Sequence, residues 1–232
     1  MRTVALETSG TTGSIALLND EHLIASEVLP SDQRSAQSLA GCLRACLRRN
    51  DWEPSQIDLV AIATGPGSFT GLRVGVTTAK TLAYAVNAAV VGVNTLEVIA
   101  AAAESCDAIW AVIDAQRQRV FCARIARCEG QLTTTQPTTV CTVDDWLGRL
   151  EPGDAVSGPI LEKLADRVAE HTTVVDRALW YPTADWVGRR AIAGYQAGRR
   201  DDIWQLVPQY FQKSAAEEQR DATADRRHGP AN

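Results

Sequence analysis

The sequence predicts an α/β fold in which one unit, a hairpin-rich sheet flanked by helices, occurs twice. The first observation is a repeated pattern. Residues 4–7 (VALE) and 111–114 (AVID) each read as an apolar strand that ends in a carboxylate and enters a polar loop. The second is the order of the expected elements, strands in succession and then alternating helices and strands, which starts again after the first hundred or so residues. We therefore expect two subdomains, residues 1–105 and a smaller one over residues 106–213.

The first subdomain is predicted to begin with three strands in hairpin succession. Polar runs and turn residues separate the apolar stretches 4–6, 14–18 and 22–28. A helix is expected over residues 35–49, where apolar residues recur at helical spacing and arginines end the run. The remaining elements are a strand at 59–64, a helix from about Leu72 to Val86, a strand at 90–93, and a helix capped by Asn94 or Thr95.

The second subdomain repeats this order in a reduced form. Strands are expected at 109–113 and 119–125, helices at 143–150, 160–169 and 184–197, and a last strand or cap at 208–211. From Ser214 onward the residues are charged or small and show no apolar face. Residues 214–232 are therefore predicted to be a frayed or disordered tail.

The composition limits the classes of function. The chain has 232 residues, of which 45% are hydrophobic, and a formal net charge of -5. Its cations form no basic stripe, so strong direct binding of nucleic acid by this chain alone is disfavoured. The start of the chain lacks the pattern of a signal peptide, and no apolar run is long enough to span a membrane. Six cysteines without a CxxC motif favour reduced thiols and a cytoplasmic location.

The sequence offers few residues for catalysis or for metal binding. The three histidines, His22, His171 and His228, are far apart and form no HxxxH or HExxH motif. None lies in a polar motif that would make a catalytic triad with a serine or cysteine. We therefore predict no catalytic residue, no metal ligand and no cofactor.

The first hairpin loop is a candidate nucleotide site. Glu7, Thr8 and Ser9 combine a carboxylate at a strand end with hydroxyl and backbone donors, and Asp114 stands at the matching position of the second unit. The same residue types also build ordinary tight hairpins, and Asp114 could instead form a strand-end ion pair with Arg117 or Arg119. The residues alone leave both alternatives open.

The segment GPGSFTGLRVG, residues 65–75, lies between a predicted strand and a predicted helix. Its glycines permit either a phosphate cradle or the close approach of another helix. A Walker loop requires Lys and then Ser or Thr after its last glycine, whereas Leu72 and Arg73 follow Gly71 here. The spacing of Gly65, Gly67 and Gly71 also fails the GxGxxG pattern. The two standard nucleotide loops are thus excluded.

A four-residue period instead favours a contact surface. Gly67, Gly71, Gly75, Ala79 and Ala83 would share one side of a helix, and helix 35–49 has small residues of its own. Packing within the chain and packing against a partner remain open. The predicted partner interface comprises Ala36, Ala40, Leu43, Leu47, Gly67, Ser68, Phe69, Thr70, Gly71, Leu72, Arg73, Gly75, Ala79 and Ala83.

Four segments resemble one known family. ETSGTTGSIALL, IATGPGSFTGLRVGVTTAKTLAYA, VIDAQRQRVF and VPQYFQKSAAEE are similar, in order and spacing, to the bacterial TsaB (YeaZ) family of tRNA threonylcarbamoyladenosine biosynthesis proteins. The resemblance spans nearly the whole chain, and its most specific part is GPGSFTGLR.

The resemblance implies a duplicated actin/Hsp70/sugar-kinase-like fold and a non-catalytic role. Members of this family are paralogues of the catalytic subunit TsaD and pair with it. Together with the ATPase TsaE they support transfer of a threonylcarbamoyl group to N6 of the adenosine beside the anticodon. We expect helices 35–49 and 72–86 to form an interface that TsaD occupies in the complex and that a second copy occupies in a homodimer.

Two positions depart from the family pattern. Glu7 stands where the family usually has Asp, and Gln33-Arg34-Ser35 replaces a His-Ser pair at the start of the first long helix. Both departures weaken the prediction of a nucleotide site. The rival functions are an ATP-dependent phosphotransferase that uses Glu7, Thr8, Ser9 and Asp114 with magnesium, and a metallopeptidase.

Overall fold

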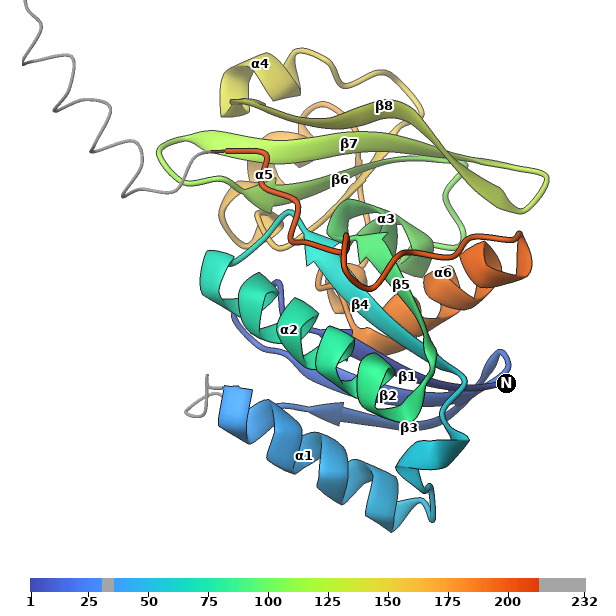
Figure 1. Cartoon of the computed structure of the whole chain (residues 1–232). Helices are drawn as coiled ribbons and strands as arrows, with labels where there is room; N and C mark the ends of the chain where they lie inside the picture. Colours follow the sequence, from blue (N-terminus) through green and yellow to red (C-terminus); the bar gives the residue numbers. More distant parts are fainter. Residues whose placement is uncertain (31–35, 213–232) are drawn as a thin grey trace, which may run out of the picture.

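The structure is a computed structural model that describes residues 1–30 and 36–212. Within these residues the strands form two five-stranded sheets (Figure 1). The first sheet has the order β3-β2-β1-β4-β5; β1, β4 and β5 are parallel, and β2 and β3 extend the sheet as antiparallel hairpins. Its strands are β1 (Arg2–Glu7), β2 (Ser14–Asn19), β3 (His22–Val28), β4 (Leu59–Gly65) and β5 (Ala89–Asn94).

The second sheet repeats this topology. Its order is β10-β9-β6-β7-β8, with β6, β9 and β10 parallel and β7 and β8 antiparallel. Its strands are β6 (Ala108–Asp114), β7 (Arg119–Cys128), β8 (Gln131–Thr142), β9 (Ala155–Ser157) and β10 (Thr173–Val174). The same strand order and directions in both sheets confirm the predicted duplication. The second unit is the reduced one, because β10 has 2 residues where its counterpart β5 has 6.

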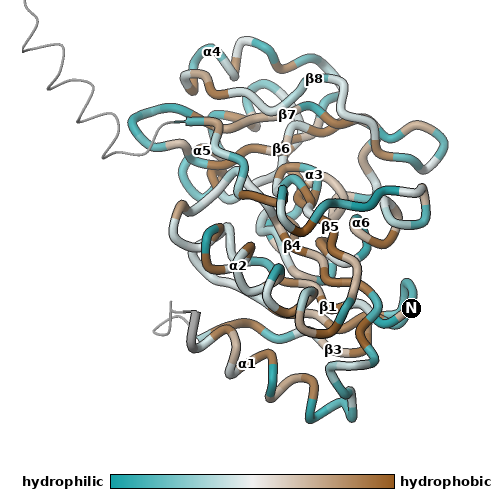
Figure 2. The backbone as a smooth tube through the Cα atoms, viewed as in Figure 1, coloured by the Kyte–Doolittle hydropathy of each residue, from teal (hydrophilic) through white to brown (hydrophobic). Residues whose placement is uncertain are grey.

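Each sheet is covered on one face by helices of its own unit. The helices α1 (Ala36–Arg49) and α2 (Phe69–Val86) pack on the first sheet, and α4 (Val143–Leu147) and α5 (Leu161–Ala169) pack on the second. Short 3₁₀ turns occupy Pro54–Gln56 and Arg177–Leu179. Figure 2 shows hydrophobic residues following the central strands, whereas polar residues gather in the outer loops. No helix among the described residues is both long and apolar enough to cross a membrane.

The last helix of each unit packs against the sheet of the other unit. The helix α6 (Ala184–Gln196) covers the first sheet, where Ala184, Val187 and Ala191 join the apolar core of β1, β2, β4 and β5. The helix α3 (Thr95–Ala102) places Leu96 and Ile99 mainly against β6 and β7 of the second sheet. The two helices also contact each other near the middle of the molecule (Figure 1).

The predicted boundary between residues 105 and 106 separates the strands of the two sheets but not the helices that cover them. The strands divide there, since β5 precedes the boundary and β6 follows it. The helix α6 lies within residues 106–213 but packs on the first sheet, so the second half of the chain does not pack as one separate unit. Gly188 makes this packing of α6 on the first sheet possible, because its lack of a side chain lets the helix approach Leu18 and Ala5 closely.

Residues 199–212, here called the C-terminal strap, run along the outer edge of β5 and then beside α2. Asp201 accepts a hydrogen bond from the Gly92 amide at 2.7 Å, and the Gln209 amide donates to the Thr64 carbonyl at 2.8 Å. The strap therefore covers the β5 edge, although residues 208–211 form no strand. The tail predicted over residues 214–232 lies outside the described residues.

Two further elements differ from the sequence predictions. The helix α2 begins at Phe69 rather than near Leu72, because the Ser68 hydroxyl caps it and accepts a hydrogen bond from the Gly71 amide at 3.3 Å. The glycine segment is thus largely the first turns of the helix. The long strand β8 was not predicted, although it spans 12 residues at the sheet edge.

Candidate functional site

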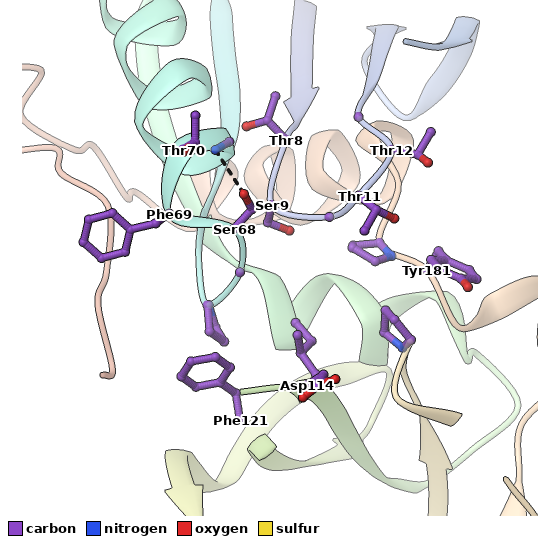
Figure 3. A pocket seen from close by; sticks show the side chains of 18 of the residues that line it. Thr8, Ser9, Thr11, Thr12, Ser68, Phe69, Thr70, Asp114, Phe121 and Tyr181 are labelled. Carbon is purple, nitrogen blue, oxygen red and sulfur yellow. Dashed lines mark hydrogen bonds between the residues drawn. The ribbon is translucent and has the colours of Figure 1, made fainter. Parts of the chain in front are cut away.

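A cavity of about 1040 Å³ lies between the two units (Figure 3). The first hairpin loop and the start of α2 line one wall, and the end of β6 with its loop lines the facing wall. Tyr181, strap residues 209–212 and residues of the α1 and α5 regions, among them Leu39 and Lys163, also line the cavity. Since β1 and β6 are equivalent strands, the cavity lies where the two equivalent loops face each other.

The predicted nucleotide residues do not all reach this cavity. Thr8, Ser9 and Asp114 line it, but Glu7 does not. The Glu7 side chain is fully buried, and its Oε1 atom accepts hydrogen bonds from the Ser9 amide at 2.7 Å and from the Ser9 hydroxyl. The carboxylate expected to face a ligand is therefore turned into its own loop.

Burial controls the protonation of Glu7. Removal from water raises its pKa to about 7, while hydrogen bonds from Ser9 and from the Gly10 and Thr8 amides oppose this shift. The second oxygen, Oε2, has no hydrogen-bond partner among the described residues. A carboxyl group in this setting is easily protonated near neutral pH.

On the facing wall, Asp114 is held by two partners. Its Oδ1 atom accepts from the Gln116 amide at 2.7 Å, and its Oδ2 atom pairs with the Lys163 ammonium at 2.7 Å. Asp114 thus forms an ion pair, but its partner Lys163 was not among the residues, Arg117 and Arg119, that the sequence analysis considered. Lys163 lies on α5. The helix α5 follows β9, which pairs with β6, and this neighbourhood is the one feature that could have suggested a contact between Lys163 and Asp114.

The glycine segment makes its close contacts within the chain. A Cβ atom at Gly71 would overlap the Thr8 carbonyl, and one at Gly75 would overlap the Thr8 hydroxyl and lie 2.9 Å from Ile62 Cδ1. The Ser68 amide also donates to the Ser9 carbonyl at 2.7 Å. These glycines let α2 press against the first hairpin and β4.

The predicted interface residues consequently fall into three groups. One group faces the core of the first unit and is not exposed to a partner; its members are Leu43, Leu47, Leu72, Gly75, Ala79 and Ala83. Others point outward, namely Ala40, Ser68, Thr70 and Arg73, while Gly67, Phe69 and Gly71 are half-buried. The side chain of Ala36 lies outside what the structure describes. The small-residue stripe that favoured a partner thus lies largely inside the molecule.

A different small-residue surface lies on the outside of α1 and α2. Ala40 and Gly41 are exposed on α1, and Thr77, Thr81 and Ala85 are exposed on α2. A Cβ atom built at Gly41 meets no other part of the described structure within 4 Å beyond its own helix turn. We call these five residues the outer face; of them, only Ala40 was in the predicted interface.

Aromatic residues of the strap pack beside α2. The Tyr210 ring stacks on Phe69 with centroids 4.0 Å apart, and Arg73 donates to the Tyr210 hydroxyl at 3.0 Å. Farther along the helix, Trp204 meets Tyr84 edge-on at 5.7 Å. The strap thus holds the side of α2 that adjoins the outer face.

The described residues contain no group of three or more His, Cys, Asp or Glu side chains placed to hold a metal ion. The six cysteines are free thiols. Burial raises the pKa of Cys46 and of Cys122 to about 12, so both are poor nucleophiles at neutral pH.

Comparison with known proteins identifies the family. The model of the family described as TsaD, tRNA N6-adenosine threonylcarbamoyltransferase, matches residues 23–220. The chain belongs to this family. Within the TsaD family it is similar to members named tRNA threonylcarbamoyladenosine biosynthesis protein TsaB. It is 28% identical to that of Bacillus subtilis, over 94% of this chain and 96% of the relative.

Further comparisons agree with this assignment. The TsaB protein of Escherichia coli is 32% identical over 133 residues, which cover 56% of this chain and 57% of the relative. The solved structure of YeaZ from Pseudomonas aeruginosa has a TM-score of 0.77 at 24% identity and covers 90% of this chain and 99% of its own. The predicted resemblance to the TsaB (YeaZ) group and the predicted fold are confirmed.

Proposed function

We propose that this chain is a non-catalytic subunit that takes part in threonylcarbamoyladenosine formation on tRNA. Membership of the TsaD family and the similarity to TsaB proteins along nearly the whole chain support this role. In this proposal a TsaD-like subunit carries the catalytic site, and a TsaE-like ATPase completes the assembly. We further propose that the chain acts in the cytoplasm and that, when TsaD is absent, a second copy binds the surface that TsaD would occupy.

The observation that carries the docking proposal is Gly41. A glycine inside a helix costs about 1 kcal/mol relative to alanine, because it loses more backbone freedom on folding. Gly41 gains no close packing in return, since outside its own helix turn no atom of residues 1–30 and 36–212 lies within 4 Å of the position of its missing Cβ atom. A role outside the chain explains its presence, as a partner helix can approach closely only where side chains are small.

The outer face has the chemistry of a helix-packing surface. Ala40 and Gly41 are exposed on α1, Thr77, Thr81 and Ala85 are exposed on α2, and none of the five carries a charge. The two helices are themselves neighbours, so two helices of a partner could pack across them. We propose that the TsaD-like subunit docks here, and we retain Ser68, Phe69, Thr70 and Arg73 as rim residues.

Size-exclusion chromatography tests this proposal. The purified chain and its cognate TsaD-like protein are expected to elute together. Gly41→Leu is expected to abolish this co-elution, because the larger side chain keeps a partner helix at a distance. Gly194→Leu is the matched control, since Gly194 lies in α6 and a Cβ atom there makes only ordinary contacts.

Two results would contradict the proposal. Separate elution of the unmodified proteins would show that the TsaD-like protein is not a partner. Full binding by a folded Gly41→Leu variant would show that the outer face is not the docking surface. Homodimerisation is expected to follow the same pattern, so light scattering should show a monomer for Gly41→Leu and a concentration-dependent dimer for Gly194→Leu.

A further inference from the structure

The cavity between the units contains the kinds of loop that bind anions in other proteins. A hairpin with successive backbone amides and the start of an 18-residue helix meet at one wall. An anion would need free N–H groups at both. The hydrogen bonds of these amides therefore decide whether a phosphoryl group can be held there.

Three amides at these two places have partners within the chain. The Ser9 amide donates to Glu7 Oε1 at 2.7 Å. At the helix start, the Ser68 amide donates to the Ser9 carbonyl at 2.7 Å and the Gly71 amide to the Ser68 hydroxyl at 3.3 Å. Three of the donors that could hold an anion are thus satisfied by one carboxylate, one carbonyl and one hydroxyl of the protein.

Glu7 is the only charged member of this arrangement, and its position is unusual for a carboxylate. It is fully buried and is absent from the cavity lining, whereas its neighbours Thr8, Ser9 and Gly10 all line the cavity. The loop therefore lies between the carboxylate and the cavity, with the Ser9 amide and hydroxyl directed toward Glu7. Burying a charge in this way is costly unless hydrogen bonds compensate for the lost water.

The glycines of α2 hold the loop in this position. Gly71 and Gly75 let the helix contact Thr8, and Gly67 lets the chain contact Ser9. The loop is thus clamped between Glu7 on one side and α2 on the other. The Ser9 amide cannot turn toward the cavity while it remains bonded to Glu7.

We propose that the Glu7 carboxylate is an internal anion that occupies the anion-binding loop of the first hairpin and so closes the cavity to phosphorylated ligands. This inference concerns the cavity alone and does not depend on any partner of the outer face. It predicts that removal of the carboxylate exposes a site for a phosphoryl group, which inorganic phosphate can probe.

The test measures thermal unfolding in sodium phosphate and in sodium chloride of equal ionic strength. The unmodified chain is expected to unfold at the same temperature in both. Glu7→Ala is expected to gain about 3 °C in phosphate, because a ligand that binds only the folded state stabilises it. Glu7→Gln is expected to gain nothing, since its amide oxygen still accepts from Ser9. Glu21→Ala, at an exposed turn, is the control.

Each alternative result decides the matter. A phosphate-dependent rise in the unmodified chain, in Glu7→Gln or in Glu21→Ala would overturn the proposal, as would a folded Glu7→Ala variant without a rise. If Glu7→Ala does not fold in chloride, the near-ultraviolet circular dichroism of a sample refolded in phosphate replaces the melting measurement. Recovery of the native spectrum in phosphate supports the proposal, and failure to recover it overturns the proposal.

Discussion

Glu7 couples the stability of the protein to pH. Its pKa is about 7 in the folded chain and 4.5 as an ordinary side chain, mainly because burial disfavours the charged form. The folded state therefore binds a proton more tightly than the unfolded state between these values. The stability that this group contributes is complete below about pH 4.5 and is lost as the pH rises through 7, by on the order of 3 kcal/mol.

Glu7→Gln should remove this dependence. The amide keeps the acceptor for Ser9 but cannot ionise, so the variant should gain stability relative to the unmodified chain as the pH rises from about 5 to about 8. Urea unfolding at both pH values gives the difference in free energy of unfolding. An equal pH dependence in the two proteins would show that Glu7 has an ordinary pKa.

For single residues, the sequence predicted which positions lie at or near the cavity better than it predicted the contacts of their side chains. Glu7 was predicted from its place at a strand end, and Thr8, Ser9 and Asp114 do line the cavity. The direction of the Glu7 carboxylate could not be predicted. Glutamate is one methylene longer than the aspartate usual in the family, and its side chain folds back onto Ser9. The Lys163 partner of Asp114 is 49 residues distant, and no local pattern links the two.

Among the helices, α2 needs its glycines for the fold. A methyl group at Gly75 would overlap the Thr8 hydroxyl and press on Ile62. Gly75→Ala should therefore destabilise the chain by about 1–3 kcal/mol, the usual cost of overpacking a core. Urea unfolding measures this loss. An unchanged midpoint would mean that α2 and the hairpin can separate without cost.

The same substitution on α1 should have the opposite effect. Gly41 has open space where its side chain would be, so Gly41→Ala should stabilise the isolated chain by about 0.5–1 kcal/mol through helix propensity alone. The two alanine variants form a matched pair, measured under identical conditions. Loss of stability in Gly41→Ala would reveal a contact of this position within the chain.

Elements with a clear period were predicted well, and the others were not. The helices α1 and α6 and the strands of the first sheet lie within a few residues of their predicted bounds. The strand β8 was missed because its sequence, QLTTTQPTTVCT, is rich in threonine and contains Pro137, which is typical of an edge strand rather than a buried one. The strands β9 and β10 are too short to show any period.

For the whole molecule, the exchange of α3 and α6 makes the two units depend on each other. Without α6, the first sheet would expose the apolar face formed by Ala5, Ala16, Leu18 and Val91. A fragment of residues 1–105 should therefore fail to fold on its own. Circular dichroism and proteolysis of this fragment test the expectation, and a cooperative unfolding transition in the isolated fragment would contradict it.

Mixing the two fragments provides the control. Residues 1–105 and 106–232, refolded together, should recover the native spectrum, because the chain break falls in the link between α3 and β6 rather than within an element. The sequence predicted the duplication, since a strand that ends in a carboxylate and enters a polar loop occurs in both halves of the chain. It could not predict the exchange, because helical periodicity shows which face of a helix is apolar but not which sheet that face will cover.

The exchange also sets an order of events during protein synthesis. The last strand of the first sheet ends at Asn94, so all five strands have been synthesised by then. The helix α6, which covers one face of this sheet, begins only at Ala184. At the usual rate of translation, on the order of 10 s passes between these two points. During that interval the nascent chain presents an uncovered sheet to the cell, so the first half should engage ribosome-associated chaperones until the last helix has emerged.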